Sequence, residues 1–480
     1  MAQESDGLTA PVNLASLLAE HPFADDEPLV HTATTSTTAG EIRRHAASRA
    51  DDLRQAGLEP GQAVAVQLPN GAELVATMFA VWQAGGVYVP VNPRLPQPEV
   101  DHILSSTGPA LFVGDGRGVV PVEGGAAQTH APGTAFVVWT SGTTGRPKPI
   151  LHTHRAYLEL LDRVLAPLRG SRPRDATKAP SPNLIPVSMA LNAGIYNALF
   201  GLRAGAPLVI MDRFVAAELA ELVARFGIRS TVLPPAAMAA LCDDPDITDL
   251  SPLRYVRSIT AALSPLQARR FHEKFGVVVL NGYGQAEIGE VIGWTAADAR
   301  EHPGKVGAVG RVHQGVSIKI LDADGAPVGS GSVGALWVRP KEMAAGYVGG
   351  DELADRLDAD GFLDTGDFAR QDEDGFVWIE GRASDVINRG GNKVFPEQVE
   401  EVLRLADGVD EAAVVGRPDE RLGQVPVAFL AGQGVADDVL VRLCRDNLAP
   451  YKVPVAFHWV DALPRSEVGK VRRADLLGQL

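Results

Sequence analysis

The residues best suited to chemistry stand together at positions 140–148, where the sequence reads Thr-Ser-Gly-Thr-Thr-Gly-Arg-Pro-Lys. Glycines let a backbone turn its amide groups toward one point and approach a ligand closely. The hydroxyl groups add hydrogen-bond donors, and Lys148 adds a positive charge. This combination suits a triphosphate. The candidate phosphate-binding residues are Thr140, Ser141, Gly142, Thr143, Thr144, Gly145 and Lys148.

This string differs from the loop of P-loop enzymes, because its lysine follows Arg-Pro and no hydroxyl residue follows the lysine. A short apolar run at 136–139 leads directly into it and predicts a strand. A cluster of Ser, Thr and Gly is by itself typical of a surface turn. The complete nine-residue string directly after a strand favours binding instead.

The elements that must position this loop alternate along the first half of the chain. Residues 63–68 predict a strand, 71–84 a helix and 86–91 the next strand. The pattern returns with a strand at 207–211, a helix at 217–226 and a strand at 230–233. Strands that alternate with helices predict layers of mostly parallel α/β structure.

The pattern changes twice in the second half. Between 304 and 347, glycines separate short alternating runs such as 316–321 and 334–338, which predicts an antiparallel, β-barrel-like subdomain. After position 383 comes a compact stretch with a predicted helix at 396–405 and a strand at 412–415. We expect an α/β protein with a large N-terminal domain at 1–383 and a small α+β domain at 384–480.

Composition limits the function classes. The 480 residues are too many for one core, and 44 basic against 59 acidic residues give a net charge of −15. Such a surface repels nucleic acid and anionic membranes, so any phosphate site must be local. Cys242 and Cys444 lack metal-ligand spacing. Without a signal peptide or an apolar run of about 18 residues, we expect a cytoplasmic enzyme, a monomer or homodimer, with no membrane span.

The string at 140–148 resembles the phosphate loop of the adenylate-forming superfamily, which contains acyl-CoA synthetases, adenylation domains of nonribosomal peptide synthetases and beetle luciferases. Further segments resemble that superfamily in the same order along nearly the whole chain. They are Asn-Gly-Tyr-Gly-Gln-Ala-Glu at 281–287, Asp-Thr-Gly-Asp at 364–367, Gly-Arg at 381–382, Gly-Gly-Asn-Lys-Val-Phe-Pro-Glu at 390–397, and Leu-Pro-Arg-Ser-Glu-Val-Gly-Lys at 463–470.

The resemblance implies a nucleotide site. Gly282 and Tyr283 would lie against adenine, where the tyrosine ring offers a flat face. Glu287 would act in catalysis by holding Mg²⁺ against the phosphates, since a carboxylate is a hard ligand. Asp367 would accept hydrogen bonds from the ribose hydroxyl groups, and Arg382 would help to hold the nucleotide.

The resemblance also implies two half-reactions, of which the first uses ATP and Mg²⁺ and the second uses CoA. A carboxylate attacks the α-phosphorus of ATP, and Lys470 would stabilise the charge of that transition state. The C-terminal domain then rotates about a hinge at Ser384, so that Gly390 and Gly391 line the tunnel for CoA. The CoA thiol attacks the acyl carbon and releases AMP.

The chain departs from the family pattern at positions on the adenylating path. Ala286 stands where a threonine usually bonds the α-phosphate, and a lost donor costs about 1–3 kcal/mol. Ile259 replaces a glycine near the acyl pocket, and Ser384 replaces the usual Asp or Lys. These departures leave a second hypothesis, in which the enzyme works chiefly on a preformed acyl-adenylate.

The substrate is expected to be a small-molecule carboxylic acid. Residues 187–195 carry no acidic side chain for an α-ammonium group, which disfavours an ordinary amino acid. The candidate acyl-pocket residues are Met189, Asn192 and Ile259, an apolar set with one polar member. They favour a hydrophobic, aryl or polycyclic acid. A carrier-protein thiol is the alternative acceptor, and a nucleotide-binding protein without catalysis is the third hypothesis.

Overall fold

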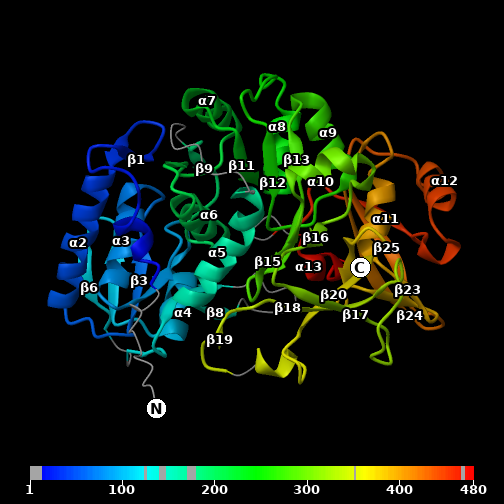
Figure 1. The fold of residues 1–480 in the computed structure, drawn as a ribbon. Coiled ribbons are helices and arrows are strands. Elements are labelled where there is room, and N and C mark those ends of the chain that lie inside the picture. The colour runs from blue at the N-terminus through cyan, green and yellow to red at the C-terminus, as the bar shows by residue number, and fades with distance from the viewer. Residues whose placement is uncertain are drawn as a thin grey trace, which may run out of the picture.

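The computed structural model describes residues 13–123, 127–139, 148–169, 180–350, 353–465 and 471–479. Within these residues, three seven-stranded sheets and one five-stranded sheet carry the fold. In Figure 1 the N-terminal elements, in blue, lie at one end of the molecule, and the C-terminal elements, in orange and red, lie at the other.

The sheet that leads to the phosphate loop has the strand order β19-β8-β7-β4-β3-β5-β6. Its centre is parallel and buried on both faces, as the apolar runs predict. The strands are β3 (Ala63–Gln67), β4 (Val87–Pro90), β5 (Leu111–Gly114), β6 (Gly118–Pro121), β7 (Thr134–Trp139), β8 (Pro149–Thr153) and β19 (Gly346–Tyr347).

The second sheet has the order β13-β12-β11-β9-β10-β1-β2, and its pairs are parallel except for β1 with β2. Its strands are β1 (Pro28–His31), β2 (Ser36–Thr38), β9 (Asn183–Ile185), β10 (Leu208–Ile210), β11 (Ser230–Leu233), β12 (Tyr255–Ser258) and β13 (Val278–Leu280).

Helices pack on these sheets because their apolar residues recur at helical spacing. In α2 (Ala39–Gln55), Thr38 and Glu41 form a capping box that fixes the start of the helix. In α3 (Ala72–Gln83), every residue from 74 to 82 is buried, so this helix lies inside the protein. The other helices here are α1 (Ser16–Ala19), α4 (Gln97–Thr107), α5 (His154–Arg169), α6 (Asn192–Arg203), α7 (Ala216–Phe226), α8 (Pro235–Asp243), α9 (Pro265–Phe275) and α10 (Ala296–Glu301).

The third sheet is antiparallel throughout, with the order β14-β15-β16-β21-β20-β18-β17. Its strands are β14 (Gly282–Gln285), β15 (Gly289–Gly293), β16 (Gly310–Val312), β17 (Ser317–Leu321), β18 (Gly334–Arg339), β20 (Leu363–Gln371) and β21 (Phe376–Arg382). Two 3₁₀ turns, η1 (Pro303–Lys305) and η2 (Ala354–Arg356), lie in its connections. This sheet and its β14–β15 turn carry most of the described candidates for nucleotide and metal binding.

The fourth sheet joins β23-β22-β25-β24, with β26 beside β25, and has a core of its own. Its elements are β22 (Ile387–Arg389), β23 (Asn392–Val394), α11 (Pro396–Leu403), β24 (Val409–Asp419), β25 (Gly423–Gly432), α12 (Asp437–Asn447), η3 (Pro450–Lys452), β26 (Phe457–Trp459) and α13 (Arg473–Leu477). Phe395 packs against Phe368 of the third sheet with ring centroids 5.6 Å apart. The two units are therefore in direct contact.

The expected fold class is confirmed, and the division into 1–383 and 384–480 stays a prediction. Two C-terminal elements differ from expectation. The helix expected to reach Leu405 ends at Leu403, and Leu405 is 48% exposed, so burial does not favour another helical turn there. The strand expected at 412–415 extends over Val409–Asp419 because it pairs along its length with β25.

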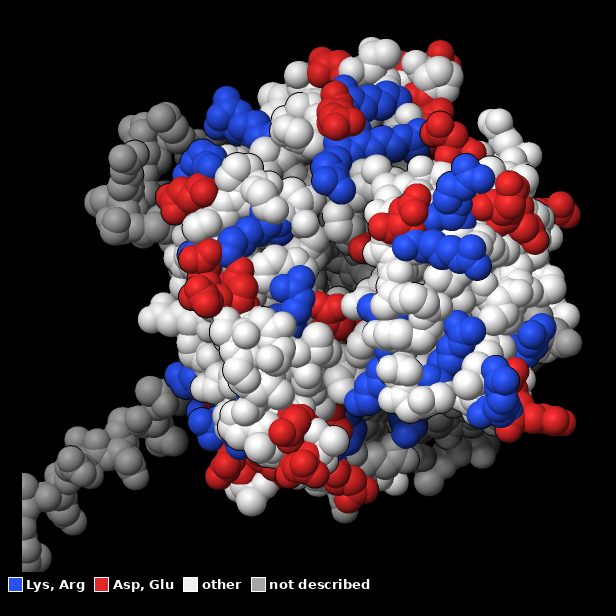
Figure 2. Space-filling model, turned by 90° about the vertical axis from the view of Figure 1, so that its right-hand side faces the viewer, with Lys and Arg blue, Asp and Glu red and all other residues white. Residues whose placement is uncertain are grey.

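Charged side chains of both signs share the molecular surface (Figure 2). In the face shown in Figure 2, acidic and basic side chains are interspersed around a central hollow, without a large area of one sign. Among the described helices, none is long and apolar enough to cross a membrane.

Candidate active site

The β14–β15 hairpin carries the first part of the site, and at two of its glycines a larger side chain would collide with neighbouring atoms. A Cβ on Gly284 would lie 2.0 Å from the carbonyl oxygen of Gly289. A Cβ on Gly289 would lie 1.8 Å from Leu160 Cδ1, and Gly289 also has a φ of +64°. Glycine at 284 therefore lets the two strands approach each other, and glycine at 289 lets the hairpin pack against α5. The hairpin presents Tyr283 on β14 and Glu287 in its turn.

Asp367, on β20, is 4% exposed and contacts side chains from two other strands, β14 and β21. Its Oδ2 accepts hydrogen bonds from the Tyr283 hydroxyl at 2.5 Å and from Gln285 Nε2 at 2.9 Å. Its Oδ1 pairs with Arg382 Nε at 3.2 Å. Burial and the charge of Asp367 both raise the pKa of Tyr283, so this hydroxyl stays a donor at neutral pH. The ring is thus held in place, and Oδ1 keeps a lone pair for a ligand hydroxyl.

Glu287 is 7% exposed and is held on one side. Its Oε1 accepts from the Tyr347 hydroxyl at 2.6 Å and from Arg356 Nη1 at 3.1 Å. Its backbone carbonyl accepts from Ala344 N at 2.8 Å. Burial and Glu287 together raise the pKa of Tyr347, so Tyr347 also stays a donor. These contacts leave Oε2 as the oxygen that could bind a metal ion.

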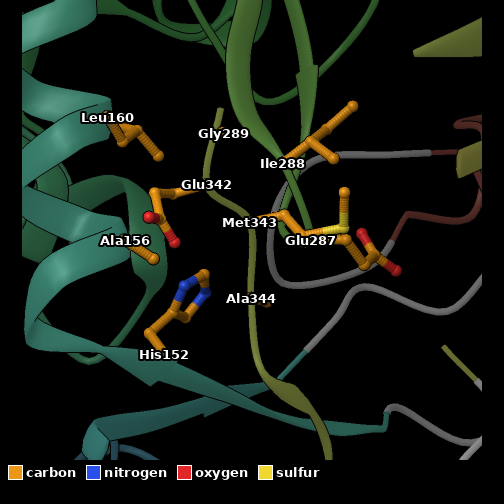
Figure 3. A pocket seen from close by; sticks show the side chains of 9 residues that line it. All are labelled: His152, Ala156, Leu160, Glu287, Ile288, Gly289, Glu342, Met343 and Ala344. Carbon is orange, nitrogen blue, oxygen red and sulfur yellow. The ribbon is translucent and has the colours of Figure 1, made fainter. Parts of the chain in front are cut away.

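Figure 3 shows this region from close by. The segment 342–344 runs between α5 and the hairpin turn, with His152 on one side of it and the Glu287 carboxylate on the other. Burial lowers the pKa of His152 to about 3, so its imidazole is neutral. Of the two, only Glu287 brings a charge to the site.

A magnesium ion fits the donor set only together with phosphates. Within the described ranges, no group of three or more His, Cys, Asp or Glu side chains could hold a metal ion. Mg²⁺ is commonly bound through one or two carboxylates and substrate phosphates, with waters completing its shell. Glu287 alone, with Oε2 available, matches that kind of site.

Arg356 joins the parts of the site and has no counterpart in the sequence-based prediction. Besides Glu287, its guanidinium donates to Gln285 Oε1 at 3.2 Å and to the Asp364 carbonyl oxygen at 2.8 and 3.1 Å. Gln285, Tyr347 and Arg356 were missed by sequence reasoning. Gln285 lies inside a recognised segment, whereas a lone Arg at the end of the short turn η2 gives no local signal in the sequence.

Lys148 lies beside this network. The strand pair β8 with β19 brings Ile150 opposite Tyr347, and Lys148 Nζ lies 5.7 Å from the centroid of the Tyr347 ring. The end of the phosphate loop therefore reaches the residue that holds Glu287. Loop residues 140–147 lie outside the described part of the chain, and so does Lys470. The binding candidates among these loop residues are Thr140, Ser141, Gly142, Thr143, Thr144 and Gly145.

The candidate acyl-pocket residues lie on two segments near the second sheet. Met189 is fully buried, and its backbone N–H donates to Asn70 Oδ1 at 2.9 Å. Asn192 begins α6, and its Oδ1 accepts from the Tyr157 hydroxyl at 2.8 Å. Ile259 follows β12 directly. Their role as an acyl pocket stays a prediction.

The C-terminal candidates lie at turns. Gly390 and Gly391 form the turn between β22 and β23 with φ values of +57° and +86°, a conformation that favours glycine. Ser384 is exposed, and its hydroxyl donates to Asp385 Oδ1 at 2.8 Å. Ser384 therefore stands where the third sheet ends and the fourth begins, and its hinge role stays a prediction.

The sequence matches known families. Residues 19–131 and 123–348 match the AMP-binding enzyme family, and residues 398–470 match the AMP-binding enzyme C-terminal domain. A sulfoacetate–CoA ligase of Cupriavidus necator is 30% identical, over 92% of this chain and 92% of the relative. A fatty acid–[acyl-carrier-protein] ligase, ScoC of Streptomyces coeruleorubidus, is 30% identical over 94% and 92%.

Solved structures agree with this match. The ATP-bound MatB structure from Rhodopseudomonas palustris has a TM-score of 0.85 to this chain, with 25% identity over 97% of this chain and 99% of that one. The similarity covers nearly the whole chain, and therefore both units of the fold. This chain therefore belongs to the AMP-binding enzymes of the adenylate-forming superfamily, and it is an ATP-dependent, AMP-forming acid–thiol ligase.

Proposed function

We propose that this acyl-CoA ligase activates a hydrophobic, aryl or polycyclic carboxylic acid as its acyl-adenylate and transfers the acyl group to CoA. The observation that carries the nucleotide half is the network in which Tyr283, Asp367 and Arg382 meet beside Glu287. The two relatives named above act on very different acids, a sulfonate and a fatty acid. The substrate class therefore rests on the apolar residues at Met189 and Ile259.

In the first half-reaction, the protein's contribution is to position and to balance charge. Tyr283 lies against adenine, and Asp367 and Arg382 hold the ribose. Glu287 would hold Mg²⁺, and the ion would supply charge neutralisation at the phosphates. Lys148 and the loop before it bind the β- and γ-phosphates, and Lys470 stabilises the charge that develops at the α-phosphorus.

In the second half-reaction, the unit at 384–480 rotates about Ser384. The turn at Gly390 and Gly391 then faces the acyl-adenylate and admits the thin arm of CoA, because glycines leave room beside the backbone. The thiol attacks the acyl carbon, AMP leaves, and the thioester is released. We place the enzyme in the cytoplasm as a monomer or homodimer.

Two alternatives follow from particular observations. Ala286 has no hydroxyl group and packs against the apolar core, which favours weak adenylation with an intact thioester step. The ScoC relative, which loads a carrier protein, favours a carrier thiol as acceptor. A chain that binds ATP without turnover is the remaining alternative.

A panel of carboxylic acids, assayed separately for pyrophosphate release and for CoA thioester, tests these functions. We expect both products from the same acid. Thioester from a synthetic acyl-adenylate with negligible ATP–pyrophosphate exchange would support the thioester-only alternative. Acylation of a phosphopantetheinyl carrier protein in preference to CoA would show that the thiol acceptor is the carrier protein and not CoA. ATP binding without pyrophosphate from any acid would contradict the proposed function.

A further inference from the structure

A buried charge cluster lies beside the candidate acid site and takes no part in the nucleotide network. Arg257, near the end of β12, forms an ion pair with Glu290 Oε1 on β15. His313 Nε2 lies 3.0 Å from the same oxygen. The side chains of Arg257, Glu290 and His313 are 12%, 13% and 6% exposed. A buried ion pair often adds little net stability, because desolvation offsets the attraction between the charges. A functional role for this pair is therefore worth considering.

The Glu290 carboxylate lies against the strand that carries the nucleotide residues. Gly282 and Gly293 are paired across β14 and β15. A Cβ on Gly282 would lie 3.3 Å from Glu290 Cδ, and one on Gly293 would lie 2.5 Å from Glu290 Oε1. Arg257 stands two residues before Ile259. The cluster therefore adjoins both Tyr283 and the segment assigned to the acid.

Glu290 is an anion in this setting. Burial by itself would raise the pKa of its carboxyl group, but Arg257 and His313 outweigh burial and the net pKa is lowered. A second carboxylate placed beside it would be repelled. The reacting carboxylate of the substrate must therefore lie elsewhere, and the cluster faces another part of the acid.

Tyr196 brings an unsatisfied hydroxyl group to this cluster. It stands one helical turn after Asn192 on α6, so both point to the same side of the helix. Burial and the charge of Glu290 raise the pKa of Tyr196, which places its hydroxyl group within electrostatic reach of that carboxylate. Among the described residues, the buried Tyr196 hydroxyl has no hydrogen-bond partner, and the same holds for Ser258 Oγ beside Arg257.

A buried hydroxyl group without a partner is costly, so a ligand that supplies the partner is favoured there. Both donors to Glu290, from Arg257 and His313, reach Oε1, which leaves Oε2 able to accept. The Tyr196 hydroxyl can donate or accept. A neutral group that both donates and accepts satisfies these atoms. An anionic group would be repelled by Glu290, and a cationic group would be repelled by Arg257.

We propose that Tyr196, Arg257 and Glu290 form part of the acid-binding site and select an acid whose apolar body carries a neutral hydrogen-bonding group, such as a hydroxyl, away from the reacting carboxylate. The inference rests on the proposed function, because it assigns the substrate class of the same site. It adds a polar requirement to the apolar pocket expected from Met189 and Ile259.

Matched acids test the proposal. The panel contains benzoate, cinnamate and 2-naphthoate, their ring-hydroxylated forms, and charged forms that carry a sulfonate or a second carboxylate. On the scaffold that fits best, we expect the hydroxyl acid to exceed the unsubstituted acid by about 10-fold or more in kcat/KM for pyrophosphate release, since sites built to bond a hydroxyl discriminate strongly. Preference for unsubstituted or charged acids on every scaffold overturns the inference and leaves the proposed function standing. No pyrophosphate from any acid overturns both.

Two variants identify the residues that discriminate. Tyr196→Phe removes only a hydroxyl group that has no hydrogen-bond partner among the described residues, so the melting temperature of the variant should not fall. The ratio of kcat/KM for the hydroxyl acid to kcat/KM for the unsubstituted acid should nevertheless fall toward one. Glu290→Gln should also lower the ratio of kcat/KM for the hydroxyl acid to kcat/KM for the unsubstituted acid, because the carboxylate that accepts from the hydroxyl is lost; the ratio is read because this variant also breaks the buried pair with Arg257. Tyr255→Phe, on the same strand as Arg257, is the matched control and should keep the full preference. An undiminished preference in Tyr196→Phe overturns the assignment.

Discussion

Arg356 joins three parts of the candidate site through one guanidinium group: the Glu287 carboxylate, the Gln285 side chain and the Asp364 carbonyl. Gln285 in turn donates to Asp367. A single planar group therefore fixes the distance between the metal-binding candidate and the ribose-binding candidate. Arginine suits this role better than lysine, because its donors are held in a rigid fork.

Replacement of Arg356 should weaken use of MgATP. We expect Arg356→Gln to lower kcat/KM for MgATP by about 10-fold to 100-fold, since the lost charged hydrogen bonds contribute about 1.5–3 kcal/mol. Arg356→Lys should restore little of it. The apparent Mg²⁺ requirement should rise as well, which a purely structural defect would not produce. Arg339→Gln, which removes a donor to the exposed Asp360 carbonyl, is the control. Equal effects of the two Gln variants would contradict the role of Arg356.

At the residue scale, sequence reasoning finds the site where motif residues are contiguous. Tyr283, Glu287 and Asp367 were predicted, and the structure places Tyr283 against Asp367 and Glu287 in the next turn. It could not find Arg356, which lies 69 positions after Glu287 and reaches it only through the fold. Likewise, the pairing of Arg257 with Glu290 depends on strands that meet in space, and neither residue stands in a recognisable pattern.

At the element scale, the β14–β15 hairpin has the strictest spatial demand in the site. Parallel strands and buried helices of the first half could be predicted because their hydrophobic periodicity is local. The extent of β24 could not, because it is set by pairing with β25. The closeness of this hairpin to Leu160 of α5 is equally invisible in the sequence, although it fixes which residue the turn can tolerate.

The substitution Gly289→Ala tests how closely the hairpin packs against Leu160. The substitution places a Cβ in a left-handed conformation and 1.8 Å from Leu160 Cδ1, so strain and overpacking should together destabilise by about 2–5 kcal/mol. Gly315→Ala has a similar positive φ, +82°, with no atom within 4 Å of the added Cβ. It isolates the cost of the backbone conformation. We expect a clearly larger fall in melting temperature for Gly289→Ala, together with a lower affinity for MgATP. Equal falls would show that the contact with Leu160 is relieved by movement.

At the scale of the whole molecule, an ionic cluster ties the C-terminal unit together next to the hinge candidate. Arg473 of α13 pairs with Asp385 at 3.2 Å, with Glu397 at 3.3 Å and with Glu400 at 2.8 Å. Arg404 also pairs with Glu400 at 3.3 Å, so three carboxylates face two guanidinium groups and their charge is not fully compensated. Glu397 Oε2 is buried without a partner among the described residues and lies against Gly381 of the third sheet. The contact between the two units is therefore sensitive to protonation.

Glu397 should make the stability of the protein depend on pH near neutrality. Burial, together with the charge of Glu400, outweighs Arg473 and raises the pKa of Glu397 to about 7. A carboxyl group with a raised pKa binds more protons in the folded state than in the unfolded state, so its contribution to stability is present at low pH. That contribution is lost as the pH rises from about 4.5 through about 7.

Glu397→Gln mimics the protonated form and should keep that stability at high pH. We expect the variant to melt above the wild type at pH 8, by about 1 °C for each kcal/mol of relief, and the difference to vanish toward pH 5. Thermal unfolding of the full chain at both pH values measures it. Glu420→Gln, at an exposed position, controls for the loss of one negative charge. A variant that melts below the wild type at pH 8 would show that the ion pair with Arg473 outweighs the burial of Glu397, which would place this carboxylate among the groups that hold the two units together.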